Sequence, residues 1–165
     1  MPTPFENAQL NLKLFDLRRE PALREARDWF TREFNPESFA DLVALAGGKR
    51  NASFRMVLSY WNMAASLVTT GAIDAEAFRA AHDEIFATFS KIYPYLAELR
   101  AASGEPDFCK DMEIVVLAAP NAQSVLERRR NALRAAAARP SEPAQKTSAQ
   151  KTSAQKTSDG SSAVP

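Results

Sequence analysis

The stretch from Met56 to Ile73 carries no charged side chain, and it limits the possible folds of this chain more than any other segment. A membrane-spanning helix needs about 20 predominantly apolar residues. Here Ser59, Asn62 and Ser66 dilute the apolar residues, and the flanking segments lack the lysine and arginine asymmetry that orients a span. We therefore predict no membrane span. The stretch should instead form a buried helix at the centre of a soluble helical domain.

Apolar residues recur at helical spacing on both sides of this stretch, and glycine or proline separates the segments. The periods predict helices near residues 10–17, 21–34, 36–46, 51–70, 74–103, 106–119 and 121–138. Asn35 is the expected N-cap before Pro36, and Pro94 removes a backbone amide and should interrupt its helix. No segment demands a strand. The sequence predicts an all-α, single-domain helical bundle of about six or seven helices over residues 5–138.

The composition changes abruptly after Arg139. Three copies of Ala-Gln-Lys-Thr-Ser begin at Ala144, Ala149 and Ala154. A polar five-residue repeat buries too little apolar surface to offset the entropy lost on ordering. We expect residues 139–165 to form a disordered, low-complexity tail.

The balance of charges and the single cysteine restrict the cellular setting and the partners. Lysine and arginine number 21 against 20 acidic residues, so no overall field attracts the chain to nucleic acid, and such binding is not expected. Cys109 has no second cysteine with which to form an internal disulfide, and the first residues do not form a signal peptide. We expect a cytoplasmic protein.

Polar residues form one stripe along the predicted helix that contains Trp61. They are spaced by four, three, four and three residues: Arg55, Ser59, Asn62, Ser66 and Thr69. Such a stripe favours one of two structures. It could line a ligand site in which Arg55 holds an anion and Asn62 and Ser66 orient it. Alternatively, it is the solvated or interhelical edge of a buried helix, with Asn62 fixing the register of its neighbours, and we favour this interpretation.

The residues that most often perform catalysis lack companions in this sequence. His82 is the only histidine, and no metal-ligand spacing surrounds it. Cys109 would need a base to form a thiolate, and His82 is the only imidazole available. The sequence leaves open whether these two side chains meet in space. We predict no catalytic residue, no metal site and no cofactor.

The last predicted helix carries a cluster of arginines, with Arg128, Arg129, Arg130 and Arg134 opposed only by Glu127. Such a cluster is a candidate contact for an acidic protein partner. Basic residues near the end of a helix also complement its dipole, so the cluster has a purely structural explanation as well.

The segment FRMVLSYWNMAASLVTTGAID, followed by IYPYLAELR, resembles a bacterial family of small helical proteins classed as a domain of unknown function. The resemblance covers Asn51 to Val116. It implies a helix over Phe54 to Thr70, a turn over Gly71 to Asp74, and a long helix interrupted near Pro94. It implies no activity, no cofactor and no catalytic residues.

These features together favour an uncharacterised protein-interaction module over an enzyme. The expected partner is another protein or a second copy, bound at an apolar groove beside the Trp61 helix. The alternative is a small-ligand or enzymatic pocket on the polar stripe. A pocket requires Arg55 and Asn62 to face a concave cavity together with a second polar group. A bundle edge leaves them on a convex surface or bonded to a neighbouring helix.

Overall fold

A computed structural model describes residues 2–139 of this chain, and it contains helices and turns with no strand in that range. The repeats of the predicted tail, from residue 140 onward, lie outside the described residues. The elements are α1 (Pro4–Arg18), α2 (Pro21–Arg32), α3 (Phe39–Ala46), α4 (Asn51–Thr69), α5 (Ala75–Ala81), α6 (Glu84–Ile92), the 3-10 turn η1 (Tyr93–Tyr95), α7 (Leu96–Ser103), α8 (Lys110–Leu117) and α9 (Ala122–Ala137). The predicted all-α fold is confirmed.

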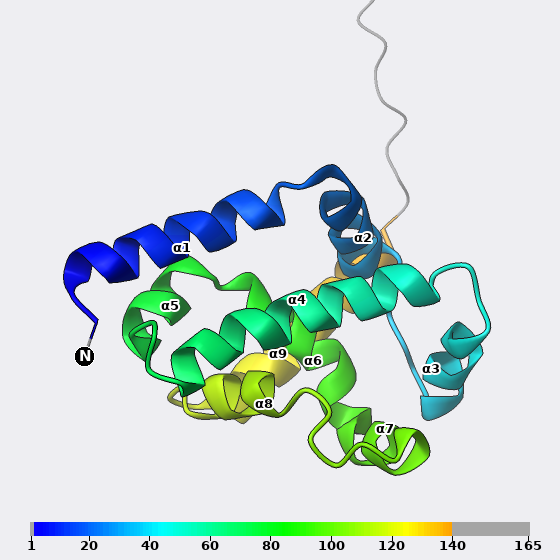
Figure 1. Ribbon diagram of the computed structural model, residues 1–165. Helices are drawn as coiled ribbons and strands as arrows, with labels where there is room; N and C mark the ends of the chain where they lie inside the picture. Colours follow the sequence, from blue (N-terminus) through cyan, green and yellow to red (C-terminus); the bar gives the residue numbers. More distant parts are fainter. Residues whose placement is uncertain (1, 140–165) are drawn as a thin grey trace, which may run out of the picture.

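Helix α4 runs through the middle of the molecule, with α2 and α8 packed against it (Figure 1). Its inner face is closed to water, and Val57, Trp61, Ala64 and Ala65 are 0% exposed. No helix among residues 2–139 is both long enough and apolar enough to cross a membrane. The prediction that the uncharged stretch forms a buried helix is therefore confirmed.

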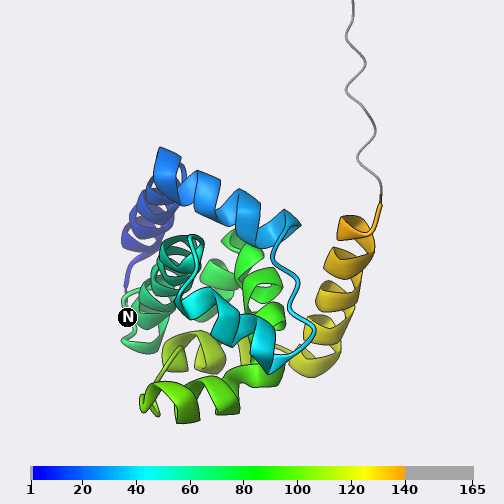
Figure 2. The same ribbon diagram turned by 90° about the vertical axis from the view of Figure 1, so that its right-hand side faces the viewer.

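Helix α6 is the second element at the centre of the bundle. It packs against α8 and α9, and Figure 2 shows α9 standing along one side of the molecule. Its side chains Ile85, Phe89 and Ile92 are 0% exposed and join the same apolar core as α4. One continuous core therefore extends from α1 to α9.

Three predicted helix boundaries are wrong. Helix α8 begins at Lys110 rather than at Pro106, because residues 106–109 form turns and Cys109 has a left-handed backbone (φ 55°). Residues 74–103 do not form one helix with a single interruption at Pro94, because the backbone of His82 (φ −128°, ψ 51°) also leaves the helical region and separates α5 from α6. Helix α3 begins at Phe39 rather than Pro36. Its N-cap is Ser38, not Asn35, since Ser38 forms a reciprocal capping box with Asp41.

A buried lysine joins α6 to the end of α2. Lys91 is 2% exposed, and its ammonium group donates to the backbone carbonyls of Phe30, Thr31 and Phe34 at 2.7, 2.9 and 2.6 Å. The last carbonyls of a helix have no hydrogen-bond partner within that helix. The three donors of Lys91 therefore bond to carbonyl oxygens that would otherwise lack a hydrogen bond inside the protein. Burial lowers the pKa of Lys91 to about 8. The contact fixes α2 on α6.

Replacement of Lys91 by methionine should lower the free energy of unfolding by roughly 3 kcal/mol, because the three carbonyls would lose their donors inside the core. Urea denaturation followed by circular dichroism measures this change. The exposed Lys49 provides the matched control, and Lys49→Met should leave stability within about 0.5 kcal/mol of the wild type. Equal stability of the two variants would contradict the capping role.

Candidate functional site

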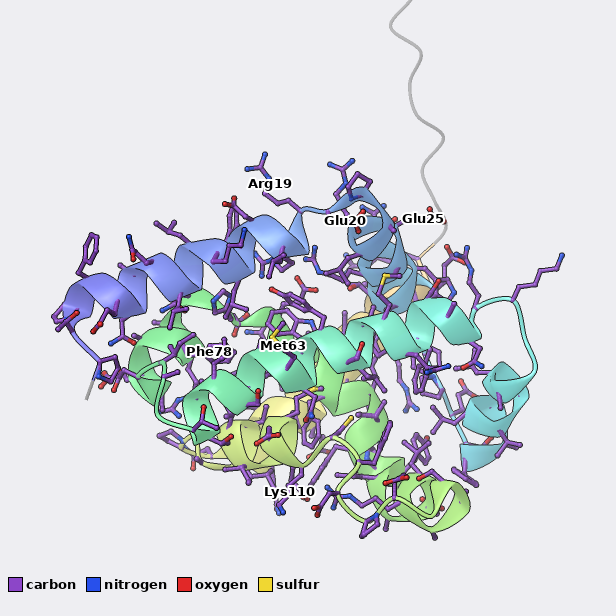
Figure 3. All side chains as sticks on the ribbon, viewed as in Figure 1. Arg19, Glu20, Glu25, Met63, Phe78 and Lys110 are labelled. Carbon is purple, nitrogen blue, oxygen red and sulfur yellow. The ribbon has the colours of Figure 1, made fainter. Side chains whose placement is uncertain are left out.

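A cavity of about 360 Å³ lies between α4 and the segment that precedes α8. In Figure 3, Lys110 marks the start of α8, which lies beneath α4. The preceding residue, Cys109, lines the cavity. The lining residues come from two segments: Phe54, Arg55, Leu58, Ser59 and Asn62 from α4, and Glu105, Asp107, Phe108 and Cys109 from the turn before α8. The cavity therefore combines apolar side chains with charges of both signs.

Asn62 links the cavity to the neighbouring helix. Its Oδ1 accepts from the backbone amide of Met112, in the first turn of α8, at 3.2 Å. The residue at the N-cap position, Cys109, has a left-handed backbone (φ 55°) and gives no side-chain cap. Asn62 thus supplies from α4 an acceptor that the N-terminus of α8 lacks locally. Its amide nitrogen has no acceptor among residues 2–139 and remains available at the cavity.

The charged residues of the cavity lie at its exposed edge. Arg55, Glu105 and Asp107 are all exposed, and Asp107 pairs with Lys110 at 3.2 Å. Within the described part of the chain, Arg55 makes no ion pair. The cavity can therefore offer a cation, an amide and two carboxylates to one bound molecule.

The predicted polar stripe divides into two parts. Arg55, Ser59 and Asn62 line the cavity, whereas Ser66 does not, and its hydroxyl donates to the carbonyl of Met63 at 2.7 Å. The hydroxyl of Thr69 donates to Oδ1 of Asp111 in α8 at 2.5 Å. The first half of the stripe therefore faces a concave cavity, and its second half is bonded within the fold.

The two reactive residues occupy separate surroundings. Cys109 lines the cavity, and burial raises the pKa of its thiol to about 12, which leaves almost no thiolate at neutral pH. His82 is 2% exposed, and its Nε2 lies 2.9 Å from Oδ1 of Asn11 in α1. No hydrogen bond joins Cys109 to His82 in the described structure. Nor do residues 2–139 contain a group of three histidine, cysteine or acidic residues that could hold a metal ion.

The arginines of α9 do not form one patch. Arg129 donates to both carboxylate oxygens of Asp83 at 2.6 and 2.5 Å, and Arg134 donates to the carbonyl of Pro36 at 2.8 Å. Arg128 is exposed, while Arg130 is half-buried beside η1. Arg129 and Arg134 thus attach α9 to the rest of the fold.

The second wall of the cavity could not be predicted from the sequence. Glu105, Asp107 and Phe108 carry no motif, and they meet α4 only because Gly104, with φ 70°, turns the chain after α7. The local signal is the pair Gly104 and Pro106. This pair predicts a turn, but it does not predict that the turn lies beside α4.

Comparison with known families identifies a match over residues 4–119 to the family described as "Domain of unknown function (DUF4760)". The chain belongs to this family. The matched range begins at α1 and ends just after α8, so it includes the whole cavity and excludes α9. No curated protein and no solved structure matches the chain.

The cap that Asn62 provides can be tested by substitution. Asn62→Leu should lower the free energy of unfolding by roughly 1 to 2 kcal/mol, because the Met112 amide would lose its acceptor. Asn62→Asp keeps an oxygen at the same place and puts a negative charge near a helix N-terminus, so it should retain most of the stability. Urea denaturation measures both variants, and a Leu variant as stable as the Asp variant would exclude the cap.

His82 should make stability depend on pH in the acid range. Burial lowers its pKa below the usual 6.5, so between its folded pKa and 6.5 the unfolded chain binds more protons than the folded chain. Its contribution is complete above pH 6.5 and is lost as the pH falls. Because this is the only histidine, the difference in unfolding free energy between wild type and His82→Gln should decrease from pH 7 to pH 5. A constant difference across that range would refute the prediction.

Proposed function

We propose that this member of the DUF4760 family is a binding protein that recognises a segment of a partner protein at the α4 cavity. The observation that carries the proposal is the composition of the cavity. The aromatic and aliphatic side chains of Phe54, Leu58 and Phe108 lie beside exposed charges of both signs. Interfaces of this kind combine an apolar centre with a polar rim.

The lining residues also indicate what the partner segment carries. An apolar side chain of the partner fits against Phe54, Leu58 and Phe108, where it removes apolar surface from water. A lysine or arginine next to it would pair with Glu105 and Asp107. A peptide segment presents both groups at adjacent positions.

Binding is favoured over catalysis by the state of Cys109, the thiol that lines the cavity. Cys109 is 5% exposed and its pKa is raised to about 12, and no base among residues 2–139 forms a hydrogen bond with it. A free, buried cysteine is compatible with a reducing environment, so we propose the cytoplasm as the setting of this interaction.

A second candidate is a small zwitterionic molecule at the same cavity. Its support is specific: Arg55 and the free amide nitrogen of Asn62 lie at the cavity with two carboxylates. A volume of about 360 Å³ also falls in the range of small-molecule sites. A thermal-shift screen of amino acids and related zwitterions tests this candidate, and a stabilising compound that loses its effect in Arg55→Gln would favour it.

Selection from a phage-displayed peptide library on the full chain tests the main proposal. We expect enriched peptides with a leucine or an aromatic residue next to lysine or arginine. Ser59 is exposed and lines the cavity, so Ser59→Trp should fill it and weaken these peptides by about tenfold or more. Met63 is 41% exposed on the same helix and does not line the cavity, so Met63→Trp is the matched control.

Fluorescence polarisation of labelled peptides gives the affinities. Full affinity for Met63→Trp together with loss in Ser59→Trp would support the α4 cavity as the site. Failure to enrich any peptide, or equal binding by the two variants, would overturn the proposal.

A further inference from the structure

The second wall of the α4 cavity is a short turn between two residues with left-handed backbones. Gly104 ends α7 at φ 70°, and Cys109 precedes α8 at φ 55°. Glycine adopts this conformation readily, but a residue with a side chain rarely does. We call residues 105–109 the wall turn, and in Figure 1 the chain runs through it from α7 to α8, below α4. The backbone conformation of Cys109 needs contacts that maintain it.

Arg100, in the last turn of α7, supplies such a contact. Its Nε donates to the carbonyl of Phe108 at 3.1 Å, and its Nη2 donates to Oε2 of Glu113 in α8 at 2.7 Å. The Phe108 carbonyl belongs to the peptide bond between Phe108 and Cys109, which both line the cavity. One planar guanidinium group therefore joins the end of α7, the wall turn and α8.

The bond to this carbonyl fixes the backbone on both sides of it. A peptide unit is planar, so its rotation changes ψ of Phe108 and φ of Cys109 together. While the carbonyl accepts from Arg100, the peptide is held in the orientation that places Cys109 at φ 55°. Rotation toward a negative φ would redirect the Phe108 side of the wall turn, which lies across the cavity from α4.

We propose that Arg100 is the positioning residue of the α4 cavity: its bond to the Phe108 carbonyl holds the wall turn in place, and loss of this bond opens the cavity. This role rests on the proposed function and deepens it, because it names the contact that regulates access to the same site. Neither Arg100 nor Glu113 lines the cavity. Substitution of either therefore moves the wall without removing a lining side chain.

The junction of α4 with α8 has contacts that do not involve Arg100. The amide of Met112 donates to Asn62 at 3.2 Å, and the amide of Glu113 donates to the carbonyl of Cys109 at 3.0 Å. Both bonds hold the first turn of α8. Loss of Arg100 should therefore displace the wall turn while α4 and α8 stay packed together.

The only cysteine of the chain reports on the wall turn. Cys109 is 5% exposed, so its thiol reacts with a chromogenic aromatic disulfide only when the structure around it opens. We expect the thiol of Arg100→Gln to react at least about tenfold faster than that of the wild type. Burial raises the pKa of this thiol and Arg100 lowers it, so loss of the arginine charge would by itself slow the reaction. Faster reaction therefore measures exposure of Cys109.

Two controls separate opening of the wall turn from a general loss of stability. Lys91→Met should destabilise the whole bundle without altering the wall turn, so its thiol should react more slowly than that of Arg100→Gln. Arg32→Gln removes an exposed arginine that pairs with Asp28 at 2.7 Å, and its thiol should react like that of the wild type. Circular dichroism verifies that each variant folds.

A second variant approaches the same contact from α8. Glu113→Gln removes the charge that holds the guanidinium group, so its thiol should also react faster than that of the wild type. If Arg100→Gln does not fold, this variant decides the question. Reaction at the wild-type rate in every variant of this pair that folds would overturn the positioning role.

Peptide affinity connects the wall turn to the proposed function. Arg100→Gln should bind the peptides selected on the α4 cavity about tenfold more weakly, and Arg32→Gln should bind them with full affinity. Full affinity of Arg100→Gln would overturn the positioning role and leave the proposed function standing. Failure to select any peptide would overturn the proposed function, and the thiol reaction would still decide whether Arg100 holds the wall turn.

Discussion

The ammonium group of Lys91 holds together the two helices on which the rest of the bundle is assembled. It reaches from α6 to the end of α2 and donates to the backbone carbonyls of Phe30, Thr31 and Phe34, and its own side chain is 2% exposed. An ammonium group has three donors and no acceptor, so the match between donors and carbonyls is complete. Because α4 packs on α2 while α8 and α9 pack on α6, this cluster joins the two groups of helices directly, in addition to the contact of α4 with α8.

Helix α4 packs between α2 and α8 and serves two purposes. Its inner face supplies Trp61 and the small residues that let α2 and α8 approach closely. Its outer face supplies one wall of the cavity. Asn62 lies where the two faces meet, and it contributes both to the capping of α8 and to the lining of the cavity. A substitution of Asn62 therefore cannot be interpreted as a binding defect unless stability is measured at the same time.

The helical fold could be predicted from the sequence, because apolar periodicity and helix-breaking residues act on the few positions around them. The uncharged stretch predicted the buried α4, Gly104 and Pro94 marked real breaks, and the family resemblance is confirmed. The break at His82 was missed, because it coincides with a contact to Asn11, 71 residues away in the chain. The buried Lys91 was missed for a similar reason. A lysine inside an amphipathic pattern is usually solvated, and only the arrival of the end of α2 makes burial favourable.

About half of the candidate site could be predicted from the sequence. Arg55, Ser59 and Asn62 share one face of a helix, and helical spacing alone is enough to group them. Glu105 and Asp107 join them through a turn whose path depends on how α7 and α8 pack, and no local pattern encodes that path. Ser66 has the same spacing as the lining residues, yet it does not line the cavity. Spacing identifies a shared face, but not where a neighbouring segment covers it.

The burial of Lys91 also gives its side chain a distinctive chemical behaviour. Acylating reagents attack the neutral amine, and in the folded protein this amine is enclosed by the last turn of α2. Exposed lysines such as Lys49 meet the reagent at all times, whereas Lys91 meets it only when α2 and α6 separate. The rate at which Lys91 is acylated, relative to Lys49, therefore reports how often α2 and α6 separate, and mass spectrometry measures it from the added mass of the acyl group.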